Sequence, residues 1–167
     1  MAMGFNTING LPTHILLVHV VVVLVPLAAL MLVASVLWPT ARHRLGPITP
    51  LVSLAALVAI PLTTESGEWL EHHTAHDPLV RIHTQLADGL LPWSAVTFLL
   101  AVVWWATHSE WVARWSRTAR IAAVTANRVV IIAMVAVAVA VSAGSVVQVY
   151  RIGDSGAKAA WHDRLGS

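Results

Sequence analysis

Histidines dominate the chemistry that this sequence offers, because it contains nine of them and no cysteine. Without cysteine, thiolate zinc sites, iron-sulfur ligation and covalent c-type haem attachment are excluded. A metal or cofactor must then be held by histidine, carboxylate, methionine or backbone groups. Six histidines lie in two short segments of the chain: His14, His19, His72, His73, His76 and His83. These segments are therefore the first candidates for a functional site.

Four apolar stretches separate and position these histidines. The chain is 57% hydrophobic and 11% charged, with a mean hydropathy of +0.75, unlike a water-soluble domain. The stretches cover residues 15–37, 48–64, 86–106 and 129–149, and a helix needs ~20 residues to cross a bilayer. We therefore expect an all-α integral membrane protein. Residues 1–150 should form an up-down-up-down four-helix bundle, and residues 151–167 a flexible polar tail.

Arginines between the apolar stretches predict how the bundle is oriented. Arg42 and Arg44 lie between the first two stretches, and four more arginines lie between the last two: Arg114, Arg117, Arg120 and Arg128. The positive-inside rule places both of these connections in the cytoplasm and both termini outside. The six histidines then share the outer side of a membrane that we expect the chain to cross several times. We read these arginines as topology signals and do not expect nucleic-acid binding.

His19 and His83 are the best candidates for the axial ligands of a b-type haem. If Pro12 and Pro78 begin their helices, these histidines lie roughly 10 Å and 8 Å below the outer helix ends. The first and third helices of such a bundle are diagonal, roughly 12–14 Å apart, which suits two imidazoles with an iron between them. His14 is about 140° around the helix from His19, so we expect it to contact a haem propionate or the surface. The first and third helices thus share a proline followed within two turns by a histidine. Beyond this, the sequence shows no long internal repeat.

Glu68 and two further histidines lead to an alternative site. A carboxylate next to a glycine at the end of an apolar span is expected to anchor a histidine or the edge of a haem. Glu68, His72 and His76 are spaced by four residues, which places divalent-metal ligands on one face if the segment is helical. However, Asp77 followed by Pro78 predicts a new helix start, so the preceding segment is equally compatible with a loop.

No nucleotide-binding or hydrolase motif is present in the sequence, and we leave enzymatic activity undecided. The main expectation is an electron-transfer protein that binds haem b near the outer face. Its partners would be the lipid bilayer and either a redox protein or a quinone. One alternative is a non-redox accessory subunit of a larger membrane complex, with merely interfacial histidines, and another is a divalent-metal-binding protein. The sequence leaves open whether the chain forms homo-oligomers.

Two sequence motifs resemble a known family. They are GLPTHILLVH at residues 10–19 and ESGEWLEHHTAHDPLVRIH at residues 65–83. They resemble the bacterial four-helix membrane proteins of domain-of-unknown-function family 2231, over residues 1 to about 110. This resemblance implies that the membrane is a bacterial cytoplasmic membrane. The matching residues are Pro12, His14, His19, Gly67, Glu68 and His83. Some such domains are fused to Rieske-type iron-sulfur domains, which implies a redox setting. Because this chain has no cysteine, its electron partner would be another molecule.

Overall fold

The structure is a computed structural model that describes residues 7–8, 11–72, 78–110 and 127–165. Its helices are α1 (Thr13–Leu37), α2 (Pro39–Leu45), α3 (Ile48–His72), α4 (Pro78–Asp88), α5 (Leu90–His108) and α8 (Arg128–Leu165). The two-residue strands β1 (Thr7–Ile8) and β2 (Leu11–Pro12) pair antiparallel ahead of α1. Within the described residues, α1, α3, α4 with α5, and α8 give four segments long and apolar enough to cross a membrane. The predicted helical membrane architecture is confirmed.

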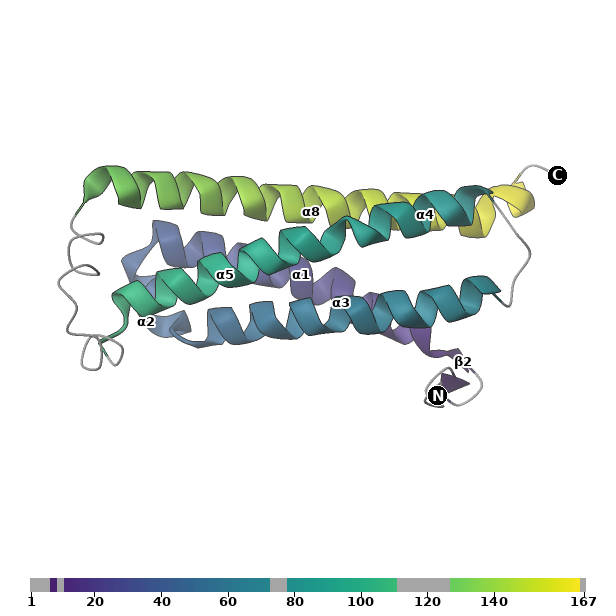
Figure 1. The fold of residues 1–167 in the computed structure, drawn as a ribbon, viewed down its shortest axis with the longest axis horizontal. Coiled ribbons are helices and arrows are strands. Elements are labelled where there is room, and N and C mark those ends of the chain that lie inside the picture. The colour runs from purple at the N-terminus through teal and green to yellow at the C-terminus, as the bar shows by residue number, and fades with distance from the viewer. Residues whose placement is uncertain (1–6, 9–10, 73–77, 111–126, 166–167) are drawn as a thin grey trace.

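The four long segments alternate in direction and lie alongside one another as a bundle (Figure 1). α1 packs mainly against α3 and α8, and α5 packs mainly against the same two helices, so α1 and α5 occupy one diagonal. The start of α1, the end of α3, the start of α4 and the end of α8 lie at one end of the bundle. We call this the histidine end, after His14 and His83, and the opposite end the arginine end, after Arg42 and Arg44. That the histidine end faces outward stays a prediction.

Small and aliphatic side chains fill the bundle core, while large apolar side chains cover its outer surface. One core cluster includes Val21, Ile60, Leu90 and Val149, and a second includes Leu32 and Trp104. Helices surrounded by lipid associate through close packing, which small residues allow. Gly144 of α8 shows this directly, because a Cβ atom there would lie 2.6 Å from Cη2 of Trp93.

The third segment is divided at Gly89 into α4 and α5. Pro92 has no N–H group to donate to the Asp88 carbonyl, and this favours an interruption of the helix at that level. Gln148 of α8 donates a 2.7 Å hydrogen bond to the Leu86 carbonyl and so ties the end of α4 to α8. The predicted helix start at Pro78 is confirmed. The segment therefore begins eight residues before the expected residue 86.

The carboxy-terminal segment differs from expectation. Composition predicts a flexible tail over residues 151–167, but α8 continues as a helix through Leu165. His83 of α4 contacts Ile152 and Ser155 in this part of α8, and Ser155 is only 8% exposed. Tertiary contacts of this kind stabilise a helix whose own composition is indifferent. For the second span, by contrast, the sequence already allows the helix to continue past Thr64 through Trp69, and α3 does so, ending at His72.

The buried positions reveal an internal repeat. Five buried residues of α1 correspond to the five buried residues of α5 at an offset of 69 positions. In α1 they are Val21, Val25, Ala28, Leu32 and Ser35. In α5 they are Leu90, Ser94, Thr97, Ala101 and Trp104. The buried residues Thr49, Ser53, Ala56 and Ile60 of α3 match Ala138, Ser142, Ser145 and Val149 of α8, 89 positions later. These offsets pair helices that run in the same direction and lie across the bundle diagonals, which is the arrangement that a pseudo-two-fold axis along the bundle produces.

Candidate functional site

His14 lies between α1 and α3 at the histidine end. Its Nδ1 atom is 3.0 Å from the Thr63 carbonyl oxygen. The Ser66 hydroxyl donates a 2.8 Å hydrogen bond to the same carbonyl and lies 3.4 Å from Nδ1. The ring packs against Gly67, where an added Cβ atom would lie 2.8 Å from Cε1. One helical turn of α3 therefore supplies the carbonyl, the hydroxyl and the close backbone contact of this imidazole.

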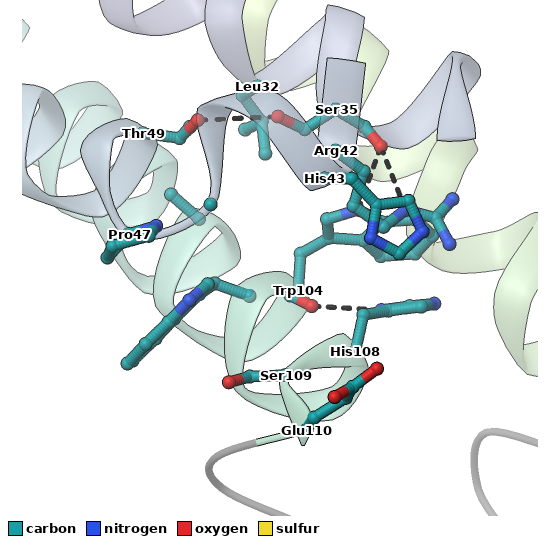
Figure 2. A pocket seen from close by; sticks show the side chains of 13 residues that line it. Leu32, Ser35, Arg42, His43, Pro47, Thr49, Trp104, His108, Ser109 and Glu110 are labelled. Carbon is teal, nitrogen blue, oxygen red and sulfur yellow. Dashed lines mark hydrogen bonds between the residues drawn. The ribbon is translucent and has the colours of Figure 1, made fainter. Parts of the chain in front are cut away.

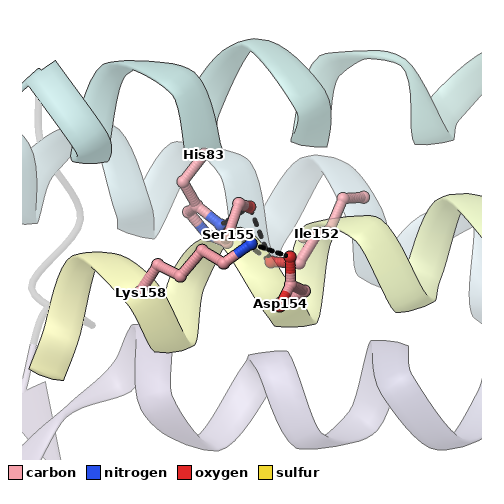
Figure 3. A network of polar contacts seen from close by, with 5 residues as sticks. All are labelled: His83, Ile152, Asp154, Ser155 and Lys158. Atoms are coloured by element: carbon pink, nitrogen blue, oxygen red, sulfur yellow. Dashed lines mark hydrogen bonds and ion pairs between the residues drawn. The ribbon is translucent and has the colours of Figure 1, made fainter. Parts of the chain in front are cut away.

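His83 lies between α4 and α8 in a matching environment (Figure 3). Its Nδ1 atom is 3.1 Å from the Ile152 carbonyl oxygen. The Ser155 hydroxyl donates a 2.8 Å hydrogen bond to this carbonyl and lies 3.1 Å from Nδ1. An added Cβ atom at Gly156 would lie 3.0 Å from Cε1. The part of α8 expected to be a tail therefore holds the second imidazole.

The two histidines occupy equivalent places in the internal repeat. His83 follows His14 by the same 69 positions that relate the buried residues of α5 to those of α1. Ser155 likewise follows Ser66 by the 89 positions that relate α8 to α3. The same pseudo-two-fold symmetry therefore relates the two imidazoles. Two separate helix pairs, α1 with α3 and α4 with α8, hold the two equivalent rings.

The hydrogen bonds define which nitrogen of each ring remains available. A carbonyl oxygen only accepts hydrogen bonds, so Nδ1 of a neutral imidazole next to it carries the proton. The lone pair then resides on Nε2, and in the described part of the chain neither Nε2 takes part in a hydrogen bond. Histidines that ligate metals donate their other N–H group to a carbonyl or carboxylate in this way. The pair is thus prepared to donate two nitrogen lone pairs.

His19, the other ligand expected from the sequence, is not in this pair. It lies on the exposed face of α1, and its Nδ1 atom is 2.6 Å from the Ile15 carbonyl of its own helix. His14 instead lies two helical turns before Val21, on the same face of α1 as the buried residues Val21, Val25 and Ala28. A separation of five residues turns the helix by about 140°, so His14 and His19 cannot share one face. His14, rather than His19, is therefore the histidine of α1 whose environment is equivalent to that of His83.

The other predicted ligands do not join the pair. Glu68 follows Gly67 on α3, and its side chain is exposed. His76 and the side chain of His72, the alternative metal ligands, lie outside the described residues. Among the residues that the structure does describe, no three histidine or carboxylate side chains come together as a metal site.

Sequence reasoning missed the groups that hold the two rings. The signal was present, because the tripeptide Glu65-Ser66-Gly67 is repeated in kind as Asp154-Ser155-Gly156. Its meaning depends on the helix pairing, which brings each tripeptide against one histidine. Four residues of these two environments, His14, Ser66, Gly67 and His83, lie within the sequence motifs at residues 10–19 and 65–83. Comparison of the chain with protein-family models, curated proteins and solved structures found no match.

Proposed function

We propose that this protein is a membrane electron-transfer protein that binds b-type haem between His14 and His83. The observation that carries the proposal is the symmetric pair of imidazoles, each with Nδ1 on a backbone carbonyl and with Nε2 outside the hydrogen bonds of the described residues. The two helices that supply them lie across the bundle diagonal. A diagonal of roughly 12–14 Å leaves room for two imidazoles and one iron.

Two features around the imidazoles support such a site. The carbonyls of Thr63 and Ile152 fix the ring orientations and increase the basicity of Nε2. Towards the bundle centre, the core cluster containing Val21, Leu90 and Val149 excludes water. An iron bound by two imidazoles in an apolar surrounding exchanges one electron without taking up a further ligand. The electron partner would be a redox protein or a quinone.

Haem content is the direct test of this proposal. The full chain, expressed with an ample supply of haem and purified gently in detergent, should contain about one haem per chain, since the repeat provides one pair of imidazoles. A pyridine haemochrome assay against protein concentration measures this ratio. The haem proposal is wrong if the purified protein contains no haem and binds none when haem is added. The alternative of a non-redox accessory subunit would then replace it.

Gly156→Ala should weaken haem binding by about tenfold, because the new methyl group displaces the ring of His83 from the Ile152 carbonyl that orients it. Gly153 lies one turn earlier on α8 and provides a matched control, since nothing lies within 4 Å of a Cβ atom placed there. Gly153→Ala should therefore leave haem affinity unchanged. Haem titration followed by absorbance compares the two variants, and equal affinities would contradict the role assigned to Gly156.

A further inference from the structure

A separate cavity of about 270 Å³ opens at the arginine end of the bundle, opposite the end that carries His14 and His83 (Figure 2). This volume greatly exceeds the ~10–15 Å³ that a single water molecule requires. Leu32, Ala101 and Trp104 contribute apolar groups to its wall. Arg42 and His108 contribute cationic or titratable groups, so the cavity combines an apolar surface with positive charge.

The guanidinium group of Arg42 is held in place by contacts of its Nε atom and of its flat face, and these contacts do not use the two Nη atoms. Nε donates a 3.2 Å hydrogen bond to the Ser35 carbonyl, which also accepts a 3.1 Å hydrogen bond from Nε1 of Trp104. The guanidinium carbon lies 4.8 Å from the centre of a Trp104 ring. In the part of the chain that the structure describes, neither Nη group donates a hydrogen bond and no carboxylate pairs with Arg42.

The charge of Arg42 is therefore partly desolvated without a counter-ion among the described residues. Burial lowers the pKa of this guanidinium, which is the electrostatic sign that its surroundings disfavour the cation. A bound anion would offset this cost. Glu110 also lines the cavity, but its side chain is exposed and forms no ion pair with Arg42.

We propose that this cavity binds a phosphate group through the Nη atoms of Arg42. A guanidinium presents parallel N–H groups that match two oxygens of a phosphate, and stacking on Trp104 holds that fork in one plane. The cavity lies at a bundle end, the level at which lipid headgroups meet a membrane protein, and basic groups there attract anionic lipids. The phosphate belongs either to a phospholipid or to a soluble phosphate compound.

Isothermal titration calorimetry on the delipidated full chain in non-ionic detergent tests the proposal. The probes are dioctanoyl phosphatidylglycerol, inorganic phosphate and dioctanoylglycerol, which has the same acyl chains without the phosphate. We expect dioctanoyl phosphatidylglycerol or inorganic phosphate to bind and dioctanoylglycerol not to bind. Binding of the lipid alone identifies a headgroup site, and binding of inorganic phosphate identifies a site for soluble anions.

Arg42→Gln should weaken phosphate binding by about tenfold or more, the usual effect of losing a charge-assisted hydrogen bond. Arg44→Gln is the matched control, because Arg44 lies on the same helix, is exposed and does not line the cavity. Because Arg42 also supports the Ser35 carbonyl, helical content and size-exclusion behaviour must match wild type. Glu110→Gln offers a test that leaves that support intact, and it should strengthen binding by about threefold. Equal losses in both arginine variants, weaker binding in Glu110→Gln, or binding of dioctanoylglycerol overturns the proposal.

Discussion

His14→Ala and His83→Ala should each lower haem affinity by at least about a hundredfold, since each removes one of the two iron ligands rather than a supporting group. The two losses should be similar, because the hydrogen bonds of the two rings match at 3.0 Å and 3.1 Å. Haem retained after size-exclusion chromatography, divided by protein concentration, provides the measurement. Helical content must be unchanged, so that loss of haem is not loss of fold.

Two further histidines serve as controls for this prediction. His19→Ala removes an exposed ring bonded to its own helix, and His108→Ala removes a ring at the arginine end that is bonded to the Trp104 carbonyl. Both variants should keep the wild-type haem content. If His19→Ala loses haem while His14→Ala retains it, the ligand pair proposed from the structure is wrong and the pair expected from the sequence takes its place.

Gly144→Leu should destabilise the bundle by about 1–3 kcal/mol, the usual cost of overpacking a close contact. The reason is that even a Cβ atom at this position would lie 2.6 Å from Cη2 of Trp93, so either the Trp93 ring must leave its position or α5 and α8 must separate. For a chain of this size the melting temperature should fall by about 5 °C. Thermal unfolding in detergent, followed by circular dichroism, measures the shift.

The neighbouring Ala143 provides the control for this substitution. Its side chain is exposed on α8, so Ala143→Leu should leave the melting temperature nearly unchanged. Trp93→Ala should relieve much of the loss in Gly144→Leu, because the double variant removes the ring that the new side chain meets. Equal shifts for both leucine variants, or no relief in the double variant, would show that the contact between Gly144 and Trp93 does not limit the approach of the two helices.

Hydropathy predicts the four membrane-spanning segments because their apolar runs are long and interrupted by polar connections. It underestimates their lengths for a physical reason, since α3 and α8 continue into polar sequence at the histidine end. There, contacts with α4 replace apolarity as the source of helix stability. The internal repeat is also hidden from sequence comparison, because the two halves share a pattern of burial more than they share residue types.

The candidate site could be predicted only in part. Both His14 and His83 are recognisable from their position in segments that open a span, and depth along the helix is readily estimated from residue number. The sequence does not show, however, towards which neighbouring helix a side chain of α1 points. α1 is apolar on nearly every side, so the sequence contains no polar face that would separate His14 from His19. Packing against α3 makes that distinction, and it also reveals the serines and carbonyls that hold the rings.

The spin state of ferric haem bound to the purified wild-type chain tests the central claim most directly. Two imidazole ligands should give a six-coordinate, low-spin absorption spectrum. His19→Ala should leave that spectrum unchanged, while any haem remaining in His14→Ala or His83→Ala should become high-spin because a ligand is missing. A wild-type spectrum that is already high-spin, or one that only His19→Ala alters, would contradict the proposal that His14 and His83 bind the iron together.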